Sequence, residues 1–105
     1  MDLNLKGQAA LVTGSTSGIG MALAQALAAE GVNVVLNGLG DPAAIENERA
    51  DMAAKYGVTV LYHDADMTRP DQIADMVAYA HKALGRLDIL VNNAGVQHVS
   101  PIEDF

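Results

Sequence analysis

The residues of this chain best suited to chemistry form one glycine-rich turn, Thr13-Gly14-Ser15-Thr16-Ser17-Gly18-Ile19-Gly20. The turn follows the apolar residues 9–12 and opens an alanine-rich stretch with a helical period. Gly14 lets the chain leave a strand sharply, Gly18 has no side chain to hold off a pyrophosphate, and Gly20 lets a helix lie close to the strand. The N–H groups and positive dipole end of that helix would point at the phosphates. The pattern therefore favours binding of a dinucleotide.

The spacing of the glycines leaves an alternative open. It is G-x-x-x-G-x-G, not the G-x-G-x-x-G of the commonest dinucleotide-binding fold, so a plain glycine-rich turn without a ligand is the competing interpretation. A P-loop is excluded because no Gly-Lys-Ser/Thr follows, and so no lysine would reach a terminal phosphate.

Alternating strand-like and helical segments must position this turn. We expect strands at residues 8–13, 32–36, 58–62 and 89–91, and helices from Gly18 to Gly31, at 42–56 and at 70–84. Asp41 and Pro42 suit the start of the second helix, Gly57 and Gly85 suit helix ends, and Thr68 with Asp71 resembles a capping box. The order predicts an α/β fold, a doubly wound parallel sheet of Rossmann-like form that stops after the fourth strand. Residues 1–105 would be the N-terminal part of a single domain of this kind.

Composition excludes several classes of partner. The chain has 105 residues, a formal net charge of -7, no basic run among its six Lys and Arg, and no cysteine. Nucleic acid and anionic membrane surfaces are therefore not expected as partners, and disulfide or thiolate chemistry is absent. The first residues are too short and polar for a signal peptide, and no apolar run approaches membrane-spanning length. We expect a soluble, cytoplasmic protein.

Ligands of doubly wound sheets bind beyond the carboxyl ends of the strands. The segments expected there are residues 14–20, 37–41, 63–67 and 92–98. Three histidines, His63, His81 and His98, lack metal-ligand spacing, and a catalytic histidine is not favoured. Asp64 and Asp66 would share a face of an extended chain, but nothing else supports a metal pair, so no metal site is predicted.

Three motifs, in this order and at these distances, resemble the short-chain dehydrogenase/reductase family along the whole chain. They are Thr13-Gly14-x3-Gly18-Ile19-Gly20, then Asp66-Met67, then Asn92-Asn93-Ala94-Gly95. More narrowly, residues 36–41 and 93–105 resemble the members of the family that oxidise 3-hydroxybutyrate. The resemblance implies an NAD(P)-dependent oxidoreductase that forms a homo-oligomer at full length.

The resemblance also implies roles for single residues. The pyrophosphate and ribose would be lined by Gly14, Ser15, Thr16, Ser17, Gly18, Ile19 and Gly20. Asp66 would accept the adenine amino hydrogen, with Met67 against the ring. Asn93, Ala94 and Gly95 would follow the ribose and nicotinamide, and the N–H of Gln97 would bind a substrate carboxylate.

Each of these assignments has a structural alternative. Asp66 could lie on a solvated loop, Met67 could fill the core, and Gln97 could be an ordinary polar loop residue. For Asn92 a structural role, tying neighbouring strands together, is favoured over a cofactor contact.

The choice of cofactor departs from the simplest rule. A carboxylate near the end of the second strand usually holds the ribose 2′-OH of NAD, but Gly38 stands there. No Lys or Arg lies between Lys6 and Arg49, so nothing is placed for a 2′-phosphate, and Asp41 would repel one. We infer NAD rather than NADP, with backbone groups serving the ribose.

The catalytic residues of the family have no match in this chain. Family members carry a Ser and a Tyr-x-x-x-Lys after the fourth unit, with the tyrosine as general acid/base. None of Tyr56, Tyr62 and Tyr79 has a Lys four residues on. A sheet that ends after the fourth strand would also present an unpaired edge, and so we expect a marginally stable or self-associating chain.

Three functions remain open at this point. The first is the cofactor-binding half of an NAD-dependent dehydrogenase of 3-hydroxybutyrate or a similar 3-hydroxy acid. The second is a 3-oxoacyl reductase of the same family that uses NADPH. The third is a non-catalytic nucleotide-binding fragment.

Overall fold

The computed structural model describes residues 5–16, 18–93 and 98–101, the last four by their backbone alone. Its elements are β1 (Ala9–Val12), α1 (Gly18–Ala29), β2 (Asn33–Asn37), α2 (Pro42–Tyr56), β3 (Val60–His63), α3 (Pro70–Leu84), β4 (Ile89–Asn92) and β5 (His98–Pro101). The predicted alternation of strands and helices is confirmed, with strand ends displaced by only one or two residues.

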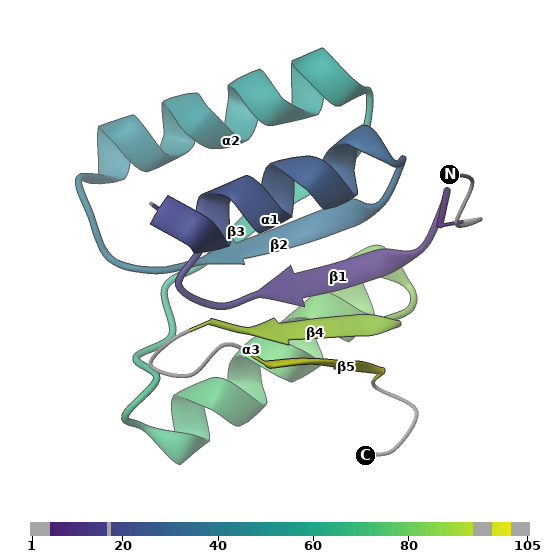
Figure 1. Ribbon diagram of the computed structural model, residues 1–105. Coiled ribbons are helices and arrows are strands. Elements are labelled where there is room, and N and C mark those ends of the chain that lie inside the picture. The colour runs from purple at the N-terminus through teal and green to yellow at the C-terminus, as the bar shows by residue number, and fades with distance from the viewer. Residues whose placement is uncertain (1–4, 17, 94–97, 102–105) are drawn as a thin grey trace.

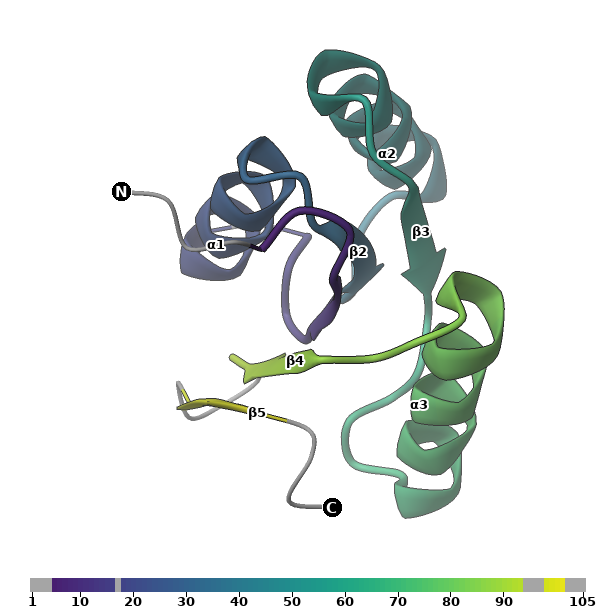
Figure 2. The same ribbon diagram turned by 90° about the vertical axis from the view of Figure 1, so that its right-hand side faces the viewer.

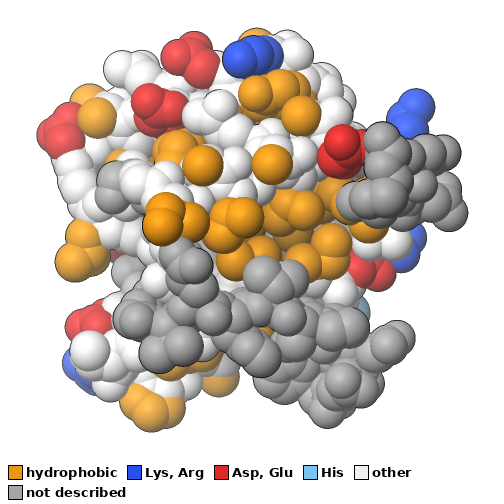
Figure 3. All heavy atoms as spheres, viewed as in Figure 1, with side chains coloured by type: hydrophobic (Ala, Val, Ile, Leu, Met, Phe, Trp, Pro, Cys, Tyr) orange, Lys and Arg blue, Asp and Glu red, His pale blue; other side chains and the backbone are white. Residues whose placement is uncertain are grey.

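The strands form one sheet in the order β3-β2-β1-β4-β5. The first four are parallel, and Val12 lies opposite both Leu36 of β2 and Val91 of β4. Helices α1 and α2 lie on one face of the sheet and α3 on the other (Figures 1 and 2). With all atoms drawn in the view of Figure 1, hydrophobic side chains gather over the middle of the molecule (Figure 3). This is the predicted doubly wound α/β fold, and it brings the carboxyl ends of four strands to one edge.

The central strands are buried on both faces, which explains their continuous apolar sequences. Side chains alternate along each strand, so Val12 and Leu36 pack toward α1 and α2 while Leu11 and Val35 pack toward α3. Small residues of α1, Ala24 and Ala28, are buried against the first face. The sheet is therefore clamped between two helical layers.

The helix ends follow the predicted chemistry with one exception. Asp41 caps α2 by accepting from the Ala44 N–H at 3.0 Å, and Gly57 ends that helix with φ 66°. The predicted capping box of Thr68 and Asp71 is wrong. Helix α3 begins at Pro70, Arg69 is its N-cap without a side-chain hydrogen bond, and the Thr68 hydroxyl donates to Asp66 instead.

The expectation of an unpaired edge beside β4 is also corrected. Strand β5 pairs antiparallel with β4, from Ile89 opposite Pro101 to Asn92 opposite His98. Strand β5 runs antiparallel along this edge of β4 and pairs with N–H and C=O groups of β4 that would otherwise face solvent. Across the part of the chain that the structure describes, no helix combines the length and apolarity needed to cross a membrane.

Candidate functional site

The candidate site lies at the carboxyl ends of β1, β2 and β3, where a cavity of about 420 Å³ opens. It is lined by Gly14, Thr16, Asn37, Gly38, Leu39, Ala65, Asp66, Met67 and Thr68. Of the residues singled out by sequence, Gly14, Thr16, Asp66 and Met67 therefore meet around one space. A ligand of doubly wound sheets is expected at this place.

The three glycines of the turn have different surroundings. Gly14 and Gly18 have φ of 60° and 61°, which favours glycine, and a Cβ on Gly18 would meet nothing within 4 Å. A Cβ on Gly20 would instead overlap the Gly14 carbonyl group. Gly20 thus permits close packing of α1, as predicted, while Gly18 leaves open space at the start of the helix. Ile19 beside it is 59% exposed.

The end of β4 is tied to the turn by two asparagines. Thr13 Oγ1 lies 3.2 Å from Asn92 Oδ1 and accepts from the Asn93 N–H at 2.9 Å. Asn93 Nδ2 donates to the Gly14 carbonyl at 3.2 Å. The contact of Asn92 with Thr13 links the ends of β4 and β1, which is the structural role expected of Asn92. The side chain of Asn93 hydrogen-bonds the backbone of the turn.

Sequence reasoning missed Asn37, which is 1% exposed at the end of β2. Its side-chain amide donates to the carbonyls of His63 and Ala65 at 3.1 and 3.0 Å. Its main-chain carbonyl accepts from the Ser15 N–H at 2.6 Å. The signal was a polar residue at the end of a buried apolar strand; the sequence analysis placed residues 37–41 at the ligand-binding edge but gave Asn37 itself no role.

Thr16 fastens the turn to the loop after β2. Its hydroxyl donates to the Leu39 carbonyl at 2.8 Å. A Cβ on Gly38 would stand 3.0 Å from Thr16 Cγ2, and the φ of 155° at Gly38 is one that L side chains rarely adopt, so a carboxylate side chain there would strain the backbone and require Thr16 to shift. Packing therefore explains why glycine replaces the acid expected near the end of the second strand.

Asp66 lies in an ordered turn on the surface of the cavity. Its Oδ1 accepts from the Thr68 N–H at 2.9 Å and from the Thr68 hydroxyl at 2.7 Å. These two donors, helped by the positive charge of Arg69, hold the pKa of the Asp66 carboxyl below its usual range. The carboxylate is exposed and ionised, so it is available to accept a hydrogen bond from a ligand.

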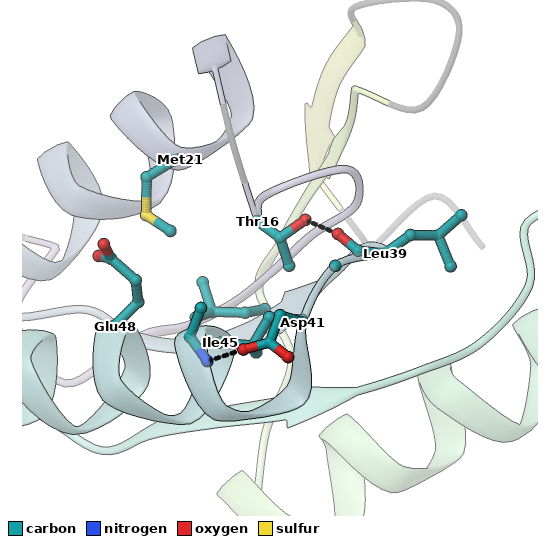
Figure 4. Close-up of a pocket in the computed structure, with 9 residues that line it drawn as sticks. Thr16, Met21, Leu39, Asp41, Ile45 and Glu48 are labelled. Carbon is teal, nitrogen blue, oxygen red and sulfur yellow. Dashed lines mark hydrogen bonds between the residues drawn. The ribbon is translucent and has the colours of Figure 1, made fainter.

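A smaller cavity of about 170 Å³ adjoins the first and shares Thr16 and Leu39 with it (Figure 4). Met21, Ile45 and the carboxylates of Asp41 and Glu48 also line it. Among the described residues that line this cavity, none is Lys or Arg. A negatively charged group entering this cavity would meet two carboxylates and no cation.

Of the histidines whose side chains the structure describes, His63 has structural contacts and His81 is exposed. The His63 ring accepts from the Ala65 N–H at 3.1 Å, lies 3.3 Å from Asp75 Oδ2 and packs on Tyr79. His81 is exposed on α3. Within residues 5–16, 18–93 and 98–101, no cluster of three or more His, Cys, Asp or Glu could hold a metal ion. Ser17, Ala94, Gly95 and Gln97 lie outside the described residues.

A glycine turn between a buried strand and a helix, beside an ordered carboxylate at the ends of parallel strands, is an arrangement typical of nucleotide-binding α/β folds. A model of the short chain dehydrogenase family matches residues 8–105. This chain therefore belongs to that family, and the resemblance drawn from its three motifs is confirmed.

Relatives and solved structures agree with this assignment. The chain is 55% identical over 101 residues to D-beta-hydroxybutyrate dehydrogenase of Cupriavidus necator, a match that covers 96% of this chain and 38% of the relative. It is also 55% identical over 96 residues to the protein of that name from Rhizobium meliloti, covering 91% and 37%. The crystal structure of L-sorbose reductase from Gluconobacter frateurii, complexed with NADPH and L-sorbose, matches with a TM-score of 0.83 and 34% identity over 100% of this chain and 40% of that one. The chain thus spans less than half the length of each of these relatives.

Proposed function

We propose that this chain supplies the cofactor-binding part of an oxidoreductase that transfers hydride between NAD and 3-hydroxybutyrate or a similar 3-hydroxy acid. The observation that carries the proposal is the open space at Gly18, where α1 begins beside the ends of the parallel strands. A pyrophosphate could approach the backbone there without meeting a side chain.

In this proposal the dinucleotide would bind in an extended form. The pyrophosphate and neighbouring ribose would lie on the turn formed by Gly14, Ser15, Thr16, Ser17, Gly18, Ile19 and Gly20. Asp66 would accept from the adenine amino group, and Met67 would pack on the ring. Asn93, Ala94 and Gly95 would lie along the second ribose and the nicotinamide, and Gln97 would bind the substrate carboxylate.

The work of these residues is to bind and orient. The nicotinamide, when bound, accepts hydride from the hydroxyl-bearing carbon of the substrate. Asn93 would hold the Gly14 carbonyl toward its own amide, 3.2 Å away, and so away from the phosphate oxygens. No Tyr-x-x-x-Lys pair is present in residues 1–105, so we assign no proton-transfer residue to this chain.

The smaller cavity supports NAD over NADP. Asp41 and Glu48 line this cavity together with Thr16, and a 2′-phosphate placed in it would be repelled by their negative charges. Because Gly38 has no carboxylate to accept from the ribose hydroxyl groups, main-chain groups of the loop after β2 would bind the ribose instead. The names of the two relatives, D-beta-hydroxybutyrate dehydrogenase, support a 3-hydroxy acid as the substrate.

A second candidate function is reduction of a ketone by NADPH, for example by a 3-oxoacyl reductase. The likeness to a reductase solved in complex with NADPH favours it. The two candidates differ in the preferred cofactor, and so the ratio of NAD to NADP affinity separates them.

The test is isothermal titration calorimetry of the purified protein with NAD and with NADP, followed by a reduced-nicotinamide absorbance assay with 3-hydroxybutyrate. The proposal predicts binding of NAD at least about tenfold tighter than NADP. Preference for NADP would support the reductase, and binding without turnover would leave a nucleotide-binding unit. Absence of binding to either dinucleotide would overturn the proposal.

A further inference from the structure

Asn37 joins the ends of three strands from a buried position at the end of β2. Both N–H groups of its side-chain amide are used, one on the His63 carbonyl at 3.1 Å and one on the Ala65 carbonyl at 3.0 Å. Its side-chain oxygen faces the Gly14 N–H at 3.4 Å. One side chain therefore spans the distance from the glycine turn after β1 to the loop after β3.

The main chain of Asn37 continues this network into the turn. Its N–H donates to Ser15 Oγ at 2.9 Å, and its carbonyl accepts from the Ser15 N–H. The Ser15 hydroxyl in turn donates to the Val12 carbonyl at 2.7 Å. Among the described residues no buried side-chain nitrogen or oxygen lacks a hydrogen-bond partner. A buried polar network in which every group is paired fixes geometry more sharply than apolar packing does.

The residue type at position 37 matters because its side-chain amide donates to two carbonyl oxygens, those of His63 and Ala65. A leucine of similar size would take the amide donor away from the buried Ala65 carbonyl and from the partly buried His63 carbonyl. An ionised aspartate would bring acceptor oxygens against acceptor oxygens. A neutral amide of this length supplies two donors and one acceptor at once, and Asn37 uses all three.

The two segments that Asn37 connects are walls of the same cavity. Gly14 lies on one side, and Ala65 with Asp66 lies on the other. In the proposed function the first segment holds the pyrophosphate and the second holds the adenine. Their separation must match the length of the adenosine half of the dinucleotide, because misplaced contacts lose affinity.

We propose that Asn37 is a positioning residue: its amide sets the spacing between the glycine turn and the Ala65–Asp66 loop, and thereby the affinity for the adenosine half of the nucleotide. This inference rests on the proposed function, since it presupposes a dinucleotide in the cavity.

The test replaces Asn37 by Asp and measures the binding of ADP-ribose by calorimetry, with circular dichroism to follow the folded fraction. The matched control is Asn33→Asp at the other end of the same strand. Asn33 uses only its side-chain oxygen, which accepts from the Thr59 N–H at 2.9 Å, and an aspartate keeps that acceptor. We expect Asn37→Asp to weaken ADP-ribose binding about 10-fold to 100-fold near neutral pH and Asn33→Asp to leave it within about twofold.

The pH profile separates positioning from a general loss of structure. A neutral carboxylic acid can donate one hydrogen bond, so Asn37→Asp should regain affinity relative to the parent as the pH falls from about 7.5 to about 5.5. The titratable groups nearest this network are Tyr62 and His63 on β3, Asp64 and Asp66 after β3, Asp75 and Tyr79 on α3, and Asp41 after β2. Strand β1 and the glycine turn carry none among their described residues. All of them are present in the parent, and so the ratio of variant to parent at each pH isolates residue 37.

A second variant, Asn37→Ser, carries the test if the aspartate variant does not fold. It is neutral and supplies one donor, so its loss of ADP-ribose affinity should be smaller than that of Asn37→Asp and independent of pH. Parental affinity in a folded Asn37→Asp or Asn37→Ser protein, or a loss that does not recover at low pH in Asn37→Asp, would overturn the inference. Absence of ADP-ribose binding by the parent would instead overturn the proposed function itself.

Discussion

Gly20 and Asn93 are in direct contact where α1 passes the end of β4: a Cβ on Gly20 would stand 2.7 Å from Asn93 Nδ2. The same Asn93 atom donates to the Gly14 carbonyl at 3.2 Å, and that carbonyl also blocks a Cβ at Gly20. The start of α1, the glycine turn and the end of β4 therefore pack so closely that a methyl group on Gly20 would have no room.

Replacing Gly20 by Ala should therefore move α1 away from β4. The clash involves main-chain atoms that cannot rotate away, so we expect a loss of about 1–3 kcal/mol in the free energy of unfolding. NAD affinity should fall at least about tenfold as the start of the helix shifts. Urea unfolding and calorimetry measure the two effects. Ala22→Ser, which adds one atom at an exposed position of the same helix, is the control. Unchanged stability in the Gly20 variant would contradict the packing described.

Asp66 should contribute to nucleotide binding through its charge. Asp66→Asn is expected to weaken ADP-ribose binding roughly tenfold, whereas Asp71→Asn, an exposed acid at the start of α3, should have no effect. The donors of Thr68 lower the pKa of Asp66, so its contribution should be constant at neutral pH and fall only below the usual aspartate range. Thr68→Val removes the hydroxyl donor, and the acid limb of the affinity profile should then move to higher pH. An acid limb that stays in place would argue against this role of Thr68.

The sequence predicted the parts of the fold that depend on local chemistry. Apolar runs, the cap at Asp41 and the glycine at 57 mark their elements because each acts within a few residues. It did not predict Asn37, because the two carbonyls that the side chain reaches lie 26 and 28 residues further along the chain. Nor did it predict that Thr16 covers Gly38 or that β5 returns along β4, since both depend on which strands become neighbours.

The carboxylates of the smaller cavity should exclude NADP. Glu48→Lys replaces a repulsive charge by an attractive one in the cavity that Asp41 also lines, and so NADP affinity should rise about tenfold while NAD affinity stays within about twofold. Glu30→Lys makes the same change of charge directly after the last residue of α1, and it should raise the affinity for neither dinucleotide. Calorimetry with both dinucleotides measures the ratio. Equal gains in the two variants would mean that net charge, and not the cavity, controls the preference.

Asp88 should stabilise the opposite end of the sheet without affecting the site. Its carboxylate pairs with Arg86 at 2.7 Å and accepts from the Ala9 N–H at 2.9 Å, and these contacts lower its pKa, the Arg86 bond most. A lowered pKa means that the stabilisation is complete above the unfolded value of about 3.9 and is lost as the pH falls through the folded value. Asp88→Asn should therefore cost about 1 kcal/mol at neutral pH and little in strong acid.

Urea unfolding at both pH values checks the prediction for Asp88. Asp51→Asn on the exposed side of α2 is the control and should cost nothing at either pH. NAD affinity should be unchanged in both variants. A cost at Asp88 that persists in strong acid would show that the charge of the carboxylate is not its source.

The most direct test of the whole account compares NAD binding by Gly18→Val and Gly57→Val. Both glycines have a left-handed backbone, with φ of 61° and 66°, and at both a Cβ would meet nothing within 4 Å, so the two variants carry similar backbone strain. Only Gly18 faces the place proposed for the pyrophosphate. The account predicts that calorimetry finds no NAD binding by Gly18→Val and near-parental binding by Gly57→Val. Equal NAD affinity in the two variants would contradict it.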